Sequence, residues 1–202
     1  MTRTELKLVD YRTVDEALTD LCSGLCPSDV ACHFCEPIPA KQIPDPFANL
    51  LVHRDHMTAR LREHHGQPIA LRVLDEVHED PLYRRKIVLT LGGTPRVVEF
   101  GVVRIDFRFA PPDARKAILE QRVPLGDVLM RCTALRQIQP RWYVKLSARC
   151  PIFAEFCDDG LDQVYGRIGT IYCDGEPAVE VLEVVTTART DAPDNPNNLG
   201  IA

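Results

Sequence analysis

Hydrophobic and polar residues alternate with a period of two over most of the chain from residue 69 to residue 185. Because successive side chains of a strand point to opposite faces, this period predicts β-strands. The turn sequences GGTP and DGE join neighbouring strands as hairpins, which indicates an antiparallel sheet. The strands are expected at 69–77, 84–91, 96–109, 141–149, 164–173 and 177–185.

Helical spacing of apolar residues replaces this period elsewhere and predicts helices at 12–21, 50–65 and 111–122, with a short one after the turn PLG. Asp55 is expected to cap the second helix, and Met57 and Leu61 to share its buried face. Strands joined by tight turns, together with these helices, predict an α+β fold. It is an antiparallel β-sheet with helices packed on one face.

The chain divides into three segments by composition. Residues 1–49 hold the first helix and a stretch rich in cysteine and proline, and residues 50–187 form the main domain. Residues 188–202 are polar and rich in proline and asparagine, so this tail is expected to be disordered.

The charge balance excludes some classes of partner. A net charge of −5 argues against a nucleic-acid-binding protein, which normally carries a strong basic bias. The sequence contains no apolar run long enough for a transmembrane helix and no apolar signal-peptide core near its start. We therefore expect a cytoplasmic protein with no nucleic-acid partner and no membrane span.

Four of the eight cysteines cluster with the spacing C-x3-C-x5-C-x2-C. This spacing is within reach of a small zinc site but matches no specific zinc motif. A redox-active pair and plain thiols remain open alternatives for Cys22, Cys26, Cys32 and Cys35.

Charged residues fall on the apolar faces of predicted strands. Glu183 shares a face with Val179, Val181 and Val185. An unpaired buried carboxylate is costly, so it needs a partner, a raised pKa or a cavity with a ligand.

Arg85 likewise shares an apolar strand face with Ile87, Leu89 and Leu91, whereas Arg84 lies on the opposite face, which looks solvated. A salt bridge with Glu183, or a pocket whose two ends bind different parts of one ligand, would explain the two inward charges. Glu99 and Arg167 are two further inward candidates whose roles stay open, and a bulge is expected at Gly101.

Other motifs add little. His53, His56, His64 and His65 are expected to form a solvated helix face. The sequence has no G-x-S-x-G, phosphate loop or G-x-G-x-x-G, which argues against the common hydrolases, kinases and dinucleotide-binding enzymes.

The ordered segments HMTARLREH, RKIVLTLGGTPRVVEFGVVRID, VPLGDVLM and YGRIGTIYCDGEPAVEVLEVV resemble the chorismate lyases (chorismate pyruvate-lyases, 4-hydroxybenzoate synthases). The likeness runs from about Leu50 to Val185. It implies a lyase that converts chorismate to 4-hydroxybenzoate and pyruvate without a metal or organic cofactor, and an aromatic product that is tightly held.

The same resemblance implies the site residues. Arg85 would bind the ring carboxylate, and Glu183 would act at the far end of the pocket, both as catalytic residues. Backbone groups of Met57 and Leu125 would help to hold the substrate. Some members of the family carry an inward arginine on the long strand where this chain has Glu99, so the second carboxylate of chorismate has no evident partner.

Two other functions fit the residues. The first is a non-catalytic, effector-sensing module of the same fold that binds a small aromatic or sugar acid. The second is a zinc-stabilised interaction protein that uses the cysteine cluster.

Overall fold

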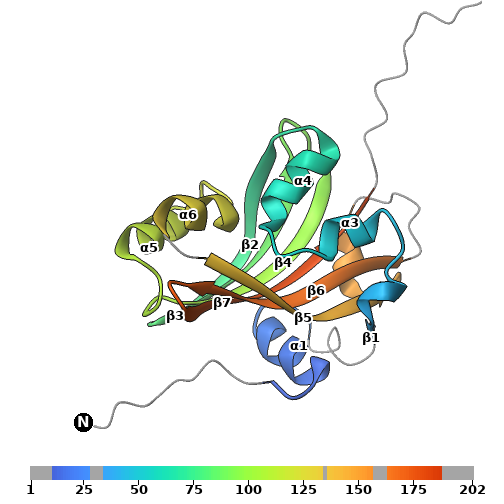
Figure 1. Ribbon diagram of the computed structural model, residues 1–202, viewed down its shortest axis with the longest axis horizontal. Helices are drawn as coiled ribbons and strands as arrows, with labels where there is room; N and C mark the ends of the chain where they lie inside the picture. The colour runs from blue at the N-terminus through green and yellow to red at the C-terminus, as the bar shows by residue number, and fades with distance from the viewer. Residues whose placement is uncertain (1–10, 28–33, 134–135, 157–162, 188–202) are drawn as a thin grey trace, which may run out of the picture.

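Seven antiparallel strands form one sheet in the order β1-β5-β6-β7-β4-β3-β2 (Figure 1). The computed structural model describes residues 11–27, 34–133, 136–156 and 163–187. The predicted α+β fold, an antiparallel sheet with helices packed on one face, is confirmed, and a further helix lies on the other face. The strands are β1 Cys35–Ile38, β2 Ile69–Glu79, β3 Leu82–Leu91, β4 Val97–Asp106, β5 Arg136–Ser147, β6 Gln163–Cys173 and β7 Glu176–Val185.

Four helices and a short 3-10 turn lie on one side of the sheet (Figure 1). They are η1 Ala40–Gln42, α3 Phe47–Leu51, α4 Met57–His65, α5 Pro112–Leu119 and α6 Leu125–Cys132. No helix in the described part of the chain is long and apolar enough to cross a membrane.

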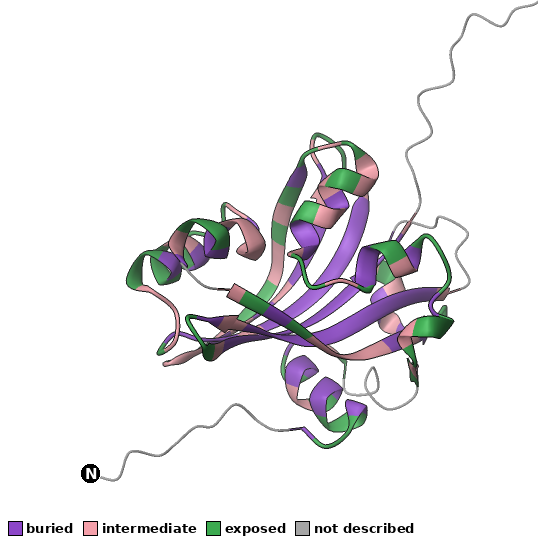
Figure 2. Cartoon of the chain, viewed as in Figure 1, coloured by how far each residue is buried: buried purple, intermediate pink, exposed green. Residues whose placement is uncertain are grey.

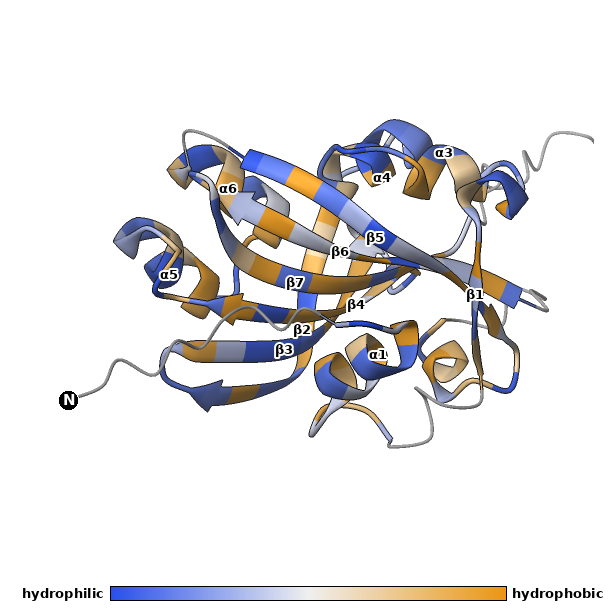
Figure 3. Cartoon of the chain, turned by 60° about the horizontal axis from the view of Figure 1, so that its bottom comes forward, coloured by the Kyte–Doolittle hydropathy of each residue, from blue (hydrophilic) through white to orange (hydrophobic). Residues whose placement is uncertain are grey.

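The other side of the sheet is covered as well, by α1 Val14–Cys22 and the 3-10 helix η2 Pro151–Glu155. Figure 3 turns this side toward the viewer and shows α1 in front of the sheet. The face of β3 that carries Arg84 was expected to be solvated, and that expectation is wrong. Val88 on this face is fully buried, because α1 brings Leu18 and Leu21 into the same apolar cluster.

The predicted helix at 50–65 is two helices, α3 and α4, with a break at residues 52–56. His56, not Asp55, is the N-cap residue of α4, and it makes no side-chain capping bond. The carboxylate of Asp55 instead pairs with Arg60 at 2.7 Å. The start of α4 is therefore left without a side-chain cap.

β1 and the first residues of β5 were not predicted, because each strand contains a proline. Pro37 is tolerated in β1, which is an edge strand. Pro140 is tolerated in β5 because it stands at a register shift between Pro140 and Trp142. Hydrophobic and hydrophilic positions alternate along β5 (Figure 3), as a strand with two different faces requires.

β4 is irregular at a different residue from the one expected. Its register with β3 shifts at Thr90, which pairs with Val97, so Val98 is the extra residue. Val97 packs in the cluster on the α1 side, whereas Val98 packs on the α4 side. Gly101 keeps regular pairing with both neighbouring strands, so the predicted bulge at this glycine is wrong.

Two predictions fall outside the described residues, namely those on Cys32 and on the tail 188–202. Cys22, Cys26 and Cys35 form no disulfide bond in the described part of the chain. That part contains no group of three or more metal-ligating side chains that could hold an ion. α1 packs against the sheet and β1 is one of its edge strands, and the domain boundary at residue 50 stays a prediction.

Candidate functional site

A small internal cavity lies between the sheet and the helices α4 and α6, with a volume of about 40 Å³. Figure 2 shows that the central strands around it are buried along most of their length. The four residues predicted as site residues, Arg85, Glu183, Met57 and Leu125, all line it. Their part in binding a ligand stays a prediction. The remaining lining residues are His56, Thr58, Leu71, Ile87, Leu89, Glu99, Val103, Pro124, Gly126, Ile138, Ile171 and Val181.

The register of three strands explains the floor of this cavity. Gly101 in β4 stands between Ile87 in β3 and Glu183 in β7. A Cβ atom at Gly101 would lie 3.1 Å from Ile87 Cδ1 and 3.5 Å from Glu99 Oε1. Glycine thus leaves room in the middle of the sheet, where any side chain would crowd its neighbours.

Arg85 is 1% exposed, and its guanidinium has few partners. Nη1 donates to the carbonyl oxygen of Ile118 at a long 3.4 Å, and Nε has no hydrogen-bond partner. Among the described residues, no carboxylate forms an ion pair with it, so the predicted alternative of a salt bridge to Glu183 is wrong. Burial lowers the pKa of Arg85, and the neighbouring Tyr83 and Glu76 act in the opposite direction.

The roof of the cavity is built from the first turns of two helices. Met57 and Thr58 begin α4, while Leu125 and Gly126 begin α6. Neither helix has a side-chain cap. The first turn of a helix has backbone N–H groups without intrahelical partners and a partial positive charge. Both helix ends therefore favour an anion in the cavity.

Glu183 has a different partner from Arg85. Arg167 in β6 stands directly across from it and donates its Nε hydrogen to Glu183 Oε2 at 2.5 Å. Arg167 is 2% exposed and also donates to the carbonyl oxygens of Leu51 and His53. The open role of Arg167 is thus that of a structural partner, which neutralises Glu183 and ties β6 to the segment before α4.

Glu99 also faces this cavity from β4 and is 4% exposed. Its Oε2 atom has no hydrogen-bond partner. Burial raises the pKa of Glu99 well above its ordinary value, the charge of Glu183 raises it further, and Arg167 opposes the shift. Burial without a cation of its own thus favours the neutral form of this carboxyl group.

The prediction of a solvated histidine face is wrong for His53 and His56. His53 Nε2 lies 2.5 Å from the carbonyl oxygen of Leu50, and its Nδ1 lies 3.3 Å from Arg167 Nη1. His56 lines the cavity, and burial followed by the charge of Arg136 lowers its pKa. The helical spacing concealed these roles, because both histidines precede the true start of α4.

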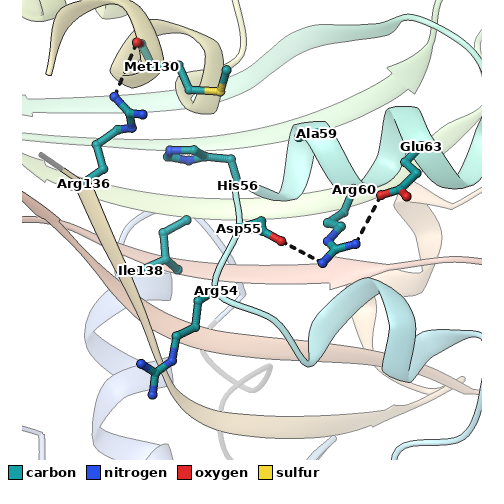
Figure 4. A pocket seen from close by; sticks show the side chains of 9 residues that line it. All are labelled: Arg54, Asp55, His56, Ala59, Arg60, Glu63, Met130, Arg136 and Ile138. Carbon is teal, nitrogen blue, oxygen red and sulfur yellow. Dashed lines mark hydrogen bonds and ion pairs between the residues drawn. The ribbon is translucent and has the colours of Figure 1, made fainter. Parts of the chain in front are cut away.

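A larger basin of about 430 Å³ opens next to the cavity (Figure 4). His56 and Ile138 line both spaces and thus separate them. Arg136 at the rim donates to the carbonyl oxygen of Met130 at 3.4 Å. His56 and Ile138 therefore form a wall that has the cavity on one side and the exposed basin on the other. Its other lining residues are Arg54, Asp55, Ala59, Arg60 and Glu63.

The comparisons with known proteins give distant structural matches only. No family model matches the chain, and no curated protein matches it. PhnF from Mycobacterium smegmatis is 12% identical with a TM-score of 0.47, over 89% of this chain and 96% of that one. The C-terminal domain of the histidine utilization repressor from Pseudomonas syringae is 10% identical with a TM-score of 0.42, over 61% and 95%. A possible transcriptional regulator from Bacillus subtilis, YydK, is 8% identical with a TM-score of 0.40, over 63% of each chain.

The prediction of a chorismate pyruvate-lyase is corrected by these findings. None of the three matched structures is described as a lyase, and two are described as a repressor domain and a transcriptional regulator. The chain therefore keeps the sheet, helices and buried cavity that the resemblance implied, while the enzymatic activity is not carried over.

Proposed function

We propose that the cavity binds a small aromatic or sugar acid without turning it over, and that Arg85 holds the carboxylate of this ligand. The observation that carries the proposal is a fully buried guanidinium with an unpartnered Nε and no ion pair among the described residues. A buried charge of this kind is costly unless something neutralises it. The planar guanidinium suits a carboxylate, which it can bind through two hydrogen bonds.

The roof supports the same ligand chemistry. The uncapped first turns of α4 and α6 line the same cavity as Arg85, and the first backbone N–H groups of a helix have no intrahelical partner. Apolar side chains of Ile87, Ile138 and Val181 line the space beside them. A cluster of donors in an otherwise apolar space is typical of a site for a small organic anion.

The size of the cavity implies a movement on binding. An engineered cavity that binds benzene has a volume of about 150 Å³, so the 40 Å³ seen here is too small for an aromatic ring as it stands. The sheet below is tightly paired, whereas the roof is made of two short helices. We expect α4 and α6 to move away from the sheet when the ligand enters.

Calorimetric titration with phenylacetate and glucuronate tests the proposal. Arg85→Met should weaken binding by about 10- to 100-fold, because a hydrogen-bonded ion pair is lost. Arg84→Met is the matched control, since this neighbouring arginine points to the other face and donates to the carbonyl oxygen of Ser23. The proposal is wrong if neither acid binds the parent protein, or if both arginine variants bind equally well.

Unfolding measurements separate binding from a structural role for Arg85. An apolar side chain of similar volume should leave the free energy of unfolding unchanged or raise it, because the buried charge has no ionic partner. A loss of more than about 3 kcal/mol in Arg85→Met would instead indicate a partnered structural arginine.

A further inference from the structure

We propose that Glu99 contacts the far end of the ligand as a neutral carboxyl group and donates a hydrogen bond to an uncharged oxygen. The ligand would then be a hydroxy acid or an oxo acid and not an amino acid. This inference rests on the proposed function and specifies the class of acid that the same cavity takes.

Glu99 has a hydrogen-bonding atom that is available inside the cavity. It faces the cavity, is 4% exposed, and leaves Oε2 without a partner. It stands opposite Val185 and diagonally from Glu183, a separation of about 7–8 Å between Cα atoms. The two carboxyl groups thus lie near each other, but only Glu183 has an ion-pair partner.

The charged groups around Glu99 favour an uncharged group at the far end of the ligand. Glu183 on β7 and Arg167 on β6 act on Glu99 directly, while Arg85 on β3 and His56 at the start of α4 line the same cavity. Arg167 neutralises Glu183, and the ligand carboxylate would neutralise Arg85. The cavity then carries no net charge when Glu99 is protonated and the far end of the ligand is uncharged. An ammonium group would add an unbalanced positive charge unless Glu99 lost its proton.

The distance along the sheet between Arg85 and Glu99 suits a ligand with two polar ends. Arg85 pairs with Val103, which is four residues along β4 from Glu99. Four residues of a strand extend about 13 Å, and the long arginine side chain reaches across part of that length. A small acid whose polar group lies opposite its carboxylate can therefore contact both ends, with its apolar body over Gly101 and Ile87.

A set of three matched acids tests the inference: phenylacetate, 4-hydroxyphenylacetate and 4-(aminomethyl)phenylacetate. The parent protein should bind the hydroxyl compound up to about tenfold more tightly than phenylacetate, as expected for one added hydrogen bond. Glu99→Gln should keep most of this ratio, because an amide also donates, whereas Glu99→Leu should reduce it to about one. Glu36→Gln, at an exposed position of β1, is the control and should keep the full ratio.

Proton counting gives an independent readout. Titration in two buffers of different ionisation enthalpy should show no proton release from Glu99 when the hydroxyl compound binds. Tightest binding of the aminomethyl compound with release of a proton would overturn the inference, as would a hydroxyl preference that survives in Glu99→Leu. Phenylacetate binding with no gain for the hydroxyl compound would overturn the inference alone, while failure of phenylacetate and glucuronate to bind would overturn the proposed function.

Discussion

Arg62 of α4 and Asp127 of α6 form an ion pair through both guanidinium nitrogens, one of them at 2.8 Å, and join two helices 65 residues apart in sequence. The carboxylate raises the pKa of Arg62. Asp127 lies in the first turn of α6, where a negative charge is also favourable for the helix dipole. This pair fastens the two halves of the cavity roof to each other.

Removal of this pair should speed ligand exchange more than it changes affinity. In Arg62→Ala, we expect the association and dissociation rates for a bound acid to rise together, because the roof opens more easily in both directions. Stopped-flow titration measures both rates. Arg60→Ala is the control, since Arg60 lies on the same helix and pairs with Asp55 and Glu63 outside the roof. Unchanged rates, or a change in the dissociation rate alone with a matching change in affinity, would contradict this role.

Gly126→Ala should loosen the contact between the two roof helices. The added Cβ would lie 3.2 Å from both His56 Cβ and Thr58 Oγ1. Alanine is about 1 kcal/mol better than glycine inside a helix, so an open contact would make this variant more stable. We expect lower stability instead, with faster amide exchange at residues 56–58. A gain in the free energy of unfolding would show that the helices are not tightly packed here.

Glu99→Gln should change how stability depends on pH. The ordinary pKa of this group is 4.5, and burial raises it well above that value in the folded protein. Above pH 4.5 the unfolded chain loses the proton that the folded protein keeps, so the parent protein loses stability as pH rises toward the raised pKa. The variant lacks this loss, and its advantage should grow by about 1.4 kcal/mol per pH unit in this window. Urea unfolding of both proteins from pH 4 to pH 8 measures the difference, and a constant difference would contradict a buried neutral Glu99.

Arg167→Met should be strongly destabilising, because it leaves Glu183 buried without its cation. The expected loss is about 3–5 kcal/mol in the free energy of unfolding. A double variant with Glu183→Gln should recover part of that loss, since the remaining group is no longer charged. A double-mutant cycle measured by urea unfolding gives the coupling between the two side chains. If the losses in unfolding free energy of the two single variants simply add in the double variant, the interaction between the two side chains contributes little to stability.

Assigning side chains to the two faces of single strands succeeded for the inward charged residues, because it requires only the period of two. It placed Arg85, Glu99, Arg167 and Glu183 on inward faces, and all four are buried there. The pairing of Glu183 with Arg167 could have been predicted, because the two residues face each other across the β6–β7 hairpin, whose DGE turn is visible in the sequence. The positions of Arg85 and Glu99 relative to this pair could not be predicted, because β4 pairs with β7, which is far from it in sequence.

The helical side of the molecule was harder to predict. The chain breaks before α4, where Asp55 pairs with Arg60 and His56 stands at the helix start. Local spacing alone made 50–65 one continuous helix and gave the histidines an exposed face. The packing of α1 on the reverse face was missed for a related reason, since an amphipathic helix does not reveal which side of a sheet it covers.

Beneath the cavity, β4 and β7 carry a second set of charges on their other face, where Arg104 bonds with Asp20 of α1 and with Glu180. The indole of Trp142, the one tryptophan in the sequence, packs in the same apolar cluster as α1. Its fluorescence therefore reports on the side of the molecule away from the ligand. A change in that emission when an acid binds would mean that the strands themselves have shifted and that occupancy is transmitted through the sheet to its opposite surface.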